Sequence, residues 1–375
     1  MSWTRAAGAA RYCRGSLPSV ARCLLFKPRL YDPLVKPFGC AGRVAFVMFA
    51  CAATGLLPGL AESASGRHPP VAAAARQLVR GGATSAIAFV SSHGHNSVAT
   101  AGERHPRPSQ RFRIGGVTKT FTAALVLQLV DQKKLRLDDS LERYLPGIVP
   151  EGAKITIHDL LQHESGLANF TDYGAWIEKA NRSRSLRPID TLRFAASKPL
   201  LFEPGSRWSY SNTNYIALGL IIEKVTGHSY RSELTRRILR PLKLAATELP
   251  TTRTLPDLHD PGYNPLLAWA AGAIVSNAND LSRFFAALFS GHVVSKAALA
   301  HMEQTVPANT IFGLWQGDGL GIFSAHLRCG RFWGHDGGIL DYSTIVEVSP
   351  GRHVAVISYR SATTEQPNMA ALLCS

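Results

Sequence analysis

The sequence predicts a mixed α/β fold of the α+β type, in which both ends of the chain form one antiparallel sheet around a helical insertion. Two observations predict it. Apolar, β-rich segments occur at 83–102 and again after about residue 310. The residues between them alternate helical patterns with loops that contain Pro and Gly. The chain has 375 residues, 46% hydrophobic and 18% charged, which is an ordinary globular composition.

Residues 1–64 differ from the rest and are predicted to be a leader with a secretory signal peptide. Arg43 precedes an apolar run at about 44–61, which ends in the small-residue sequence AESA. A membrane anchor is the alternative, but glycine and proline interrupt the run, which is short for a span. We therefore expect a secreted, periplasmic or cell-envelope protein whose folded module spans 65–375.

The charge balance excludes one class of partner. The net charge is +15, but no basic run with interleaved aromatic residues occurs, so nucleic acid is not an expected partner. Association with anionic cell-wall polymers is one interpretation of the excess charge. A merely solvated basic surface is the other.

The elements follow one another in the order that this fold requires. Residues 83–102 read as a hairpin with a His-Gly-His-Asn turn, and 117–132 as a helix that is apolar on all sides and therefore buried. Glycines end the helical patterns at 155–167, 215–227 and 279–291. The expected later elements are strands 320–327, 331–335, 340–348 and 353–359, a turn at 349–352, and a helix at 367–374. The sheet subdomain is expected at about 75–135 and 295–375, and the helical subdomain at about 136–294.

Three short patterns carry residue types used in catalysis. The first is Gly116-Val-Thr-Lys119, whose two ends share a helix face because they are three residues apart. The second is Tyr210-Ser-Asn212, and the third is the strand sequence His335-Asp-Gly-Gly338.

In these patterns the chain resembles the serine β-lactamase and D-alanyl-D-alanine carboxypeptidase family, in particular its class C β-lactamase-like branch. That family carries S-x-x-K, then Y-x-N, then a K-T-G or H-x-G strand. The segments LLQHESGL, EPGSRWSYSNTNY, IIEKVTGHSY and AAGAIVSNANDLSRFFAALFSG also match. The resemblance covers about residues 75–375. It implies a β-lactamase/transpeptidase-like fold, with an antiparallel sheet flanked by terminal helices, a helical subdomain, and the site between them.

The resemblance also implies the role of each residue. Gly116 stands at the position of the nucleophilic serine, while Lys119 and Tyr210 act together as general base and acid. Asn212 and His335 complete the set. The backbone N–H groups of Gly116 and Gly338 would hold the oxyanion. No metal or cofactor is expected.

No other hydroxyl is expected to replace the serine. Thr118 points about 200° away from residue 116 on a helix. Thr120 and Ser211 belong to other faces, and His163 is interpreted as structural. Water held by Lys119 and Tyr210 is the remaining alternative.

The missing nucleophile leaves two interpretations open. One is a hydrolase of this family that is inactive as written. The other is a non-catalytic protein that binds peptidoglycan-like peptides or β-lactams. Because glycine is a poor helix former, serine at 116 is expected to be tolerated structurally.

The third pattern departs from the family in the residues that would hold a substrate carboxylate. Asp336 and Gly338 replace hydroxyl residues, and Phe323 falls where an arginine would be expected. An aspartate at this place would repel a carboxylate. The expected ligand is a small peptide, ester or β-lactam, with esters preferred over carboxylate-terminated peptides, and the expected state is a monomer.

Two of the six cysteines, Cys329 and Cys374, lie outside the leader. Two cysteines in an exported chain suggest a disulfide. The resemblance implies the same pairing, because secreted carboxypeptidases of the family pair similar positions.

Overall fold

The structure is a computed structural model that describes residues 69–103, 106–255, 257–258, 262–308, 315–349, 353–360 and 374. These residues belong to one compact unit. The predicted leader, the helix expected at 367–374 and most of the turn at 349–352 lie outside the described residues.

The centre of the described residues is an eight-stranded antiparallel sheet in the order β2-β1-β10-β9-β8-β7-β6-β5, with a separate two-stranded sheet formed by β3 and β4. The first hairpin pairs with the last strand, because β1 lies against β10 along its length. The sheet is therefore built from both ends of the chain, as predicted. The strands are β1 Ser85–Ser92, β2 His95–Gly102, β3 Phe112–Arg113, β4 Val275–Ser276, β5 Val306–Pro307, β6 Gly317–Asp318, β7 Phe323–Leu327, β8 Gly330–Ile339, β9 Tyr342–Val348 and β10 Val354–Arg360.

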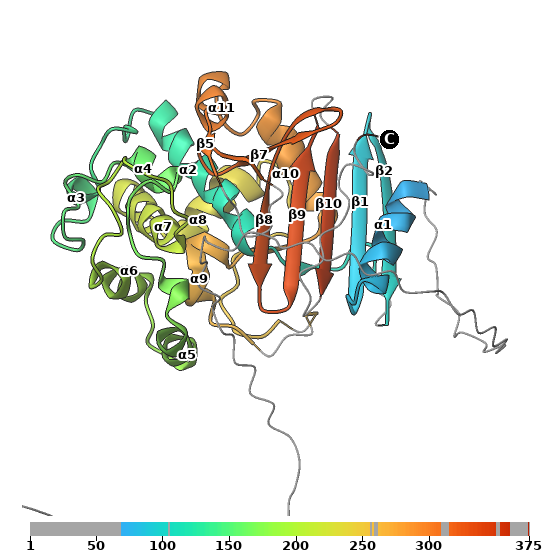
Figure 1. Cartoon of the computed structure of the whole chain (residues 1–375), viewed down its shortest axis with the longest axis horizontal. Coiled ribbons are helices and arrows are strands. Elements are labelled where there is room, and N and C mark those ends of the chain that lie inside the picture. The colour runs from blue at the N-terminus through green and yellow to red at the C-terminus, as the bar shows by residue number, and fades with distance from the viewer. Residues whose placement is uncertain are drawn as a thin grey trace, which may run out of the picture. The chain divides into compact units, whose positions relative to one another are not determined.

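Helices cover both faces of the sheet. Helix α1 packs on β1 and β2, whereas α10 packs on β1, β9 and β10. Figure 1 shows β8, β9 and β10 in red continuing into β1 and β2 in blue, with the green helices beyond the β8 side. The helices and short turns are α1 Pro69–Arg80, η1 Gly115–Val117, α2 Thr118–Asp131, α3 Leu141–Tyr144, α4 Ile157–Leu161, η2 Phe170–Asp172, α5 Gly174–Arg182, α6 Pro188–Ala196, α7 Asn212–Thr226, α8 Tyr230–Leu234, η3 Thr235–Leu239, α9 Pro265–Gly272, α10 Ala278–Phe289 and α11 Lys296–Met302.

Several element boundaries differ from the prediction. Strand β8 continues to Ile339 instead of ending at 335, and α4 ends at Leu161, well before Gly166. The resemblance implied terminal helices, but the residues of α1 were not identified as a helix from the sequence. Helix α10 falls within the range expected for the helical subdomain but packs on the sheet.

Helix α2 is buried along most of its length because α7, α8, α9 and α11 pack around it. Its polar side chains are paired inside the protein. Thr118 accepts a hydrogen bond from the N–H of Ile274, Thr120 donates to the carbonyl of Gly321, and Thr122 donates to Ala270. Burying these hydroxyls is therefore not costly.

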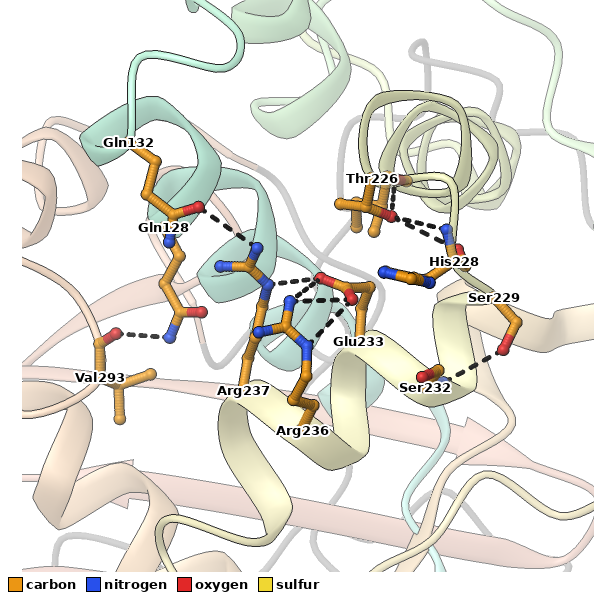
Figure 2. A network of polar contacts seen from close by, with 11 residues as sticks. Gln128, Gln132, Thr226, His228, Ser229, Ser232, Glu233, Arg236, Arg237 and Val293 are labelled. Carbon is orange, nitrogen blue, oxygen red and sulfur yellow. Dashed lines mark hydrogen bonds and ion pairs between the residues drawn. The ribbon is translucent and has the colours of Figure 1, made fainter.

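An ion network around the buried Glu233 attaches the end of α2 to α8 and η3 (Figure 2). Burial would raise the pKa of Glu233, but hydrogen bonds from Arg237 and Arg236 outweigh it and lower that pKa. Arg237 is itself almost buried and also donates to the side-chain oxygen of Gln132 at 3.2 Å. The network thus fixes the helical layer against the helix that carries Lys119.

Cys329 and Cys374 form a disulfide, with their Cα atoms 5.6 Å apart. Among the described residues, none of the helices combines the length and the apolar character needed to span a bilayer.

Candidate active site

The site is formed where η1 meets residues 335–339 of β8, which pair with β9 but not with β7. Gly115 adopts a φ of +50°, and a Cβ on Gly337 would lie 2.1 Å from the carbonyl oxygen of Ile114. Only glycine permits such a close approach of two backbones. The contact brings Gly116 beside β8, near Gly338.

Lys119, in the first turn of α2, is fully buried. Its Nζ donates to the Oδ1 of Asn212 at 2.7 Å and to the carbonyl of Ala271 at 2.9 Å. It also lies 4.9 Å from the ring centre of Tyr210. Burial lowers the pKa of Lys119 to about 7, although the charges of Asp336 and Asp318 act in the opposite direction. A large fraction of this amine is therefore neutral near pH 7, as a general base requires.

Tyr210 and Asn212 stand at the start of α7. The Tyr210 hydroxyl lies 3.5 Å from the Asn212 Oδ1 that also accepts from Lys119. Burial, with the charges of Asp336 and Asp318, raises the pKa of Tyr210 well above 10. Tyr210 is thus a neutral phenol at neutral pH.

The neighbours of these two residues are structural. His163 accepts the N–H of Ser211 through Nδ1, and its ring lies 4.5 Å from that of Tyr210. Burial, with the charge of Lys119, lowers the pKa of His163 well below 6.5. Ser211 is buried and donates to the carbonyl of Ala168.

His335 of β8 completes the cluster from the sheet side. Its Nδ1 lies 2.5 Å from the carbonyl oxygen of Asp336, which can only accept, so Nδ1 carries the proton. Burial, with the charge of Lys119, lowers the pKa of His335 to about 3. The imidazole is therefore neutral and its Nε2 is an acceptor.

Gly116 lies where these groups converge. A Cβ on this residue would be 3.4 Å from the Tyr210 hydroxyl, 3.3 Å from the His335 Cε1 and 2.7 Å from the carbonyl oxygen of Asp336. The last distance is too short for real atoms, so β8 must move before any larger side chain fits. The expectation that serine is tolerated here is not supported, because residue 116 belongs to η1 beside β8 and not to an open helix.

A cavity of about 600 Å³ opens above Gly116. A Cβ on Gly338 would meet no atom within 4 Å, so this residue faces open space. The lining residues are Gly115, Gly116, Asn169, Phe170, Thr171, Asp172, Trp208, Ser209, Tyr210, Asn212, Tyr263, Ala268, Ala271, Gly272, Phe323, Asp336, Gly337, Gly338, Ile339 and Leu340.

Part of this wall was not singled out from the sequence. Asn169 accepts the backbone N–H of Asn212, and Thr171 accepts from its side-chain amide. Both residues follow the ESGL segment, whose match to the family was the one available signal. Trp208 donates to the buried carboxyl of Asp318 at 2.6 Å, which fixes its indole at the cavity.

The chain is similar to several known proteins. The family model described as Beta-lactamase matches residues 71–371. Penicillin-binding protein 4* of Bacillus subtilis (strain 168) is 28% identical over 283 residues, which are 67% of this chain and 61% of that protein. Protein flp of Staphylococcus aureus (strain N315) is 33% identical over 150 residues, 39% of this chain and 29% of that protein. This chain thus spans less than two thirds of these relatives.

Two solved structures share the fold over most of the chain. The D-stereospecific amidohydrolase from Streptomyces sp. has a TM-score of 0.73 and 33% identity, covering 78% of this chain and 94% of its own. The D-amino acid amidase from Ochrobactrum anthropi SV3, complexed with D-phenylalanine, has a TM-score of 0.71 and 25% identity, covering 79% and 93%.

The match to the family thus extends from α1, across the whole helical layer, to the last strand of the sheet, and it agrees with the antiparallel fold and with the solved relatives. On these grounds the chain belongs to the beta-lactamase family.

Proposed function

We propose that this chain binds small amide, ester or β-lactam carbonyl compounds in the cavity and forms no covalent acyl intermediate with them. One observation carries the proposal. Tyr210 and His335 converge on residue 116, close to Lys119, yet residue 116 is glycine and offers no attacking oxygen.

The groups that would recognise a carbonyl remain. The backbone N–H groups of Gly116 and Gly338 are the proposed donors to the carbonyl oxygen. Loss of the nucleophile in a comparable enzyme costs on the order of 10⁶ in turnover, and binding with the oxyanion donors retains roughly 10³–10⁴ over water. Water held by Lys119 and Tyr210 would not restore this difference.

The solved relatives suggest the ligand class. They include a D-stereospecific amidohydrolase and a D-amino acid amidase complexed with L-phenylalanine amide. Amino-acid amides are therefore proposed as ligands beside peptides, esters and β-lactams.

A second candidate function, serine-type hydrolysis by a form of the chain with serine at 116, is favoured by Lys119. The pKa of Lys119, about 7, suits a general base. A general base has no role in a protein that only binds its ligand. A residue with this tuning is unexpected in a protein that only binds.

The cellular setting is also a proposal. We infer export to the cell envelope from the predicted signal peptide, with a disulfide-stabilised C-terminal end. A monomer is proposed, although one structural relative is the octameric penicillin-binding protein homologue from Pyrococcus abyssi.

The test combines calorimetry with intact-protein mass spectrometry. The protein should bind N-acetyl-phenylalanine amide reversibly and gain no mass from benzylpenicillin. Gly338→Leu, which directs a side chain into the cavity, should weaken binding at least about 10-fold, a free-energy loss of about 1.4 kcal/mol. Gly174→Leu is the matched control, since it also meets no atom within 4 Å but lies outside the cavity. Absence of binding, or equal affinity in the Gly338→Leu protein, would refute the proposal.

A further inference from the structure

We propose that Asp336 makes this cavity selective for carbonyl ligands that carry a positively charged amino group near the carbonyl, such as amino-acid amides with a free α-amino group. The inference rests on the proposed function and adds the charge of the ligand. Its basis is the distribution of charged and aromatic groups around the cavity.

The Asp336 carboxyl is a largely buried acid without a bound cation. Its side chain is 13% exposed, and its Oδ1 lies 3.9 Å from the Nδ1 of His335, which is a neutral ring. Within the described residues, no Lys or Arg forms an ion pair with this carboxyl, and the Trp315 N–H that lowers its pKa is a neutral donor. The carboxylate therefore lacks the cationic partner that usually accompanies a buried acid.

Among the described residues, the basic group that acts on Asp336 is the Lys119 amine, which is directed elsewhere. Lys119 uses its Nζ for Asn212 and for the carbonyl of Ala271. Among the described residues that line the cavity, none is Lys, Arg or His, whereas Asp336 and Asp172 are both acids. A ligand ammonium would therefore meet complementary charge from two walls, and a ligand carboxylate would be repelled.

The remaining wall is aromatic. Phe170, Trp208, Tyr263 and Phe323 line the cavity. The faces of such rings attract cations and also accept an apolar side chain. A ligand with one ammonium group and one aromatic or aliphatic side chain fits this combination better than a dianionic or strongly polar one.

Asp336 lies on the same strand as Gly338, the proposed donor to the carbonyl oxygen, and both line the cavity. Residues two apart on a strand share a face and lie about 7 Å apart, so Asp336 and Gly338 meet the same ligand. If Gly338 donates to the carbonyl oxygen, an amino group on the neighbouring carbon comes within reach of the Asp336 side chain. An α-amino amide, whose amino group is on the carbon next to the carbonyl, is therefore the proposed ligand class.

The test uses the unmodified protein and three ligands with the same ring: phenylalanine amide, N-acetyl-phenylalanine amide and N-acetyl-phenylalanine, each as both enantiomers. At pH 7 we expect the amine of at least one enantiomer to bind about 10-fold more tightly than its neutral analogue, and the carboxylate to bind most weakly. Asp336→Asn should reduce the amine preference to less than about 3-fold. Asp138→Asn is the matched control, because this acid is exposed and outside the cavity.

The pH dependence of the amine preference tests the role of Asp336 independently. Burial raises the pKa of Asp336 to about 6, with Trp315 and Lys119 acting in the opposite direction. The titratable groups that interact with Asp336 are His335, Lys119, Tyr210 and Tyr359, and Asp172 lines the same cavity. The amine preference should grow from pH 5 to 7 as the carboxyl ionises, and decline above about pH 8 as an α-amino group loses its proton.

The two proposals fail in different ways. Equal affinity for the amine and its neutral analogue, or a preference that survives in a folded Asp336→Asn protein, would overturn the selectivity and leave the proposed function standing. Binding of none of the three ligands would remove both. Should Asp336→Asn not fold, the three-ligand series on the unmodified protein still decides the matter.

Discussion

The Nζ of Lys119 lies 2.7 Å from the Oδ1 of Asn212, and this contact joins the first turn of α2 to the first residue of α7. The amide is a neutral acceptor, so it holds the amine in place without adding a negative charge that would favour the protonated form. Asn212 thus sets the position of the Lys119 amine, whereas burial is the main cause of its lowered pKa.

Asn212→Asp should therefore raise the pKa of Lys119. A carboxylate at this distance favours the ammonium form and is expected to raise the pKa by more than about 1 unit from its value near 7. A ¹³C NMR titration of the lysine ε-carbons measures this, with the resonance assigned by its loss in Lys119→Met. Asn181→Asp is the control for an added charge elsewhere. A native Lys119 that titrates near 10 would contradict the description of the site.

Gly116→Ala should destabilise the protein, although alanine is the better helix former. The added Cβ lies 2.7 Å from the carbonyl oxygen of Asp336, and overpacking of this kind typically costs about 1–3 kcal/mol. Urea denaturation measures the change. Gly338→Ala, whose Cβ meets nothing within 4 Å, is expected to be neutral or slightly stabilising. Equal stability of Gly116→Ala and the native protein would show that β8 can shift away from residue 116 at little cost in free energy.

The sequence predicted the large elements of the fold because their patterns are local. The uniform apolar run of α2 and the glycine that ends α7 are readable without tertiary information. Gly227 indeed adopts the left-handed conformation that ends the helix, with a φ of 71°.

The errors arise where tertiary contacts override local preference. Strand β8 was expected to end at 335, but it continues through Gly337 and Gly338, and the close approach of η1 requires a glycine at 337. Trp269, with a φ of 35° and a ψ of −117° inside α9, could not have been anticipated from its residue type. The cavity wall at Asn169 and Thr171 depends on how one loop folds over α7, which no periodicity encodes.

Glu347 should make the stability of the protein fall as the pH rises. It is fully buried on β9 opposite Gly334 and Ala355, and neither carboxyl oxygen has a hydrogen-bond partner within the described residues. Burial raises its pKa to about 8. The folded state thus holds the proton more tightly than the unfolded state, so the stabilisation is complete below about pH 4.5 and is lost between there and pH 8.

Glu347→Gln is the variant that checks this. It should flatten the pH dependence and, at pH 8, raise the free energy of unfolding by an amount on the order of 3–5 kcal/mol. Chemical denaturation at pH 5 and pH 8 measures both effects. An unchanged slope in the variant would mean that Glu347 is charged and solvated in the folded protein.

Glu233→Gln should be among the most destabilising single substitutions in the helical layer. It leaves Arg237 almost buried without its carboxylate, which typically costs about 3–5 kcal/mol. Arg236→Gln removes the partner that is 56% exposed and should cost less than about 1 kcal/mol. Denaturation midpoints of the two variants give the comparison, and similar losses in both would contradict the ranking.

The central claim is that this site lacks its attacking oxygen while the groups around it are in place. Intact-protein mass spectrometry after incubation with a fluorescent penicillin and with a fluorophosphonate tests it most directly. The native protein should remain unlabelled. Gly116→Ser, shown by circular dichroism to be folded despite the contact with Asp336, should gain one adduct from at least one reagent, and the double variant Gly116→Ser with Lys119→Met should not. Labelling of the native chain, or a folded Gly116→Ser protein inert to both reagents, would contradict the account.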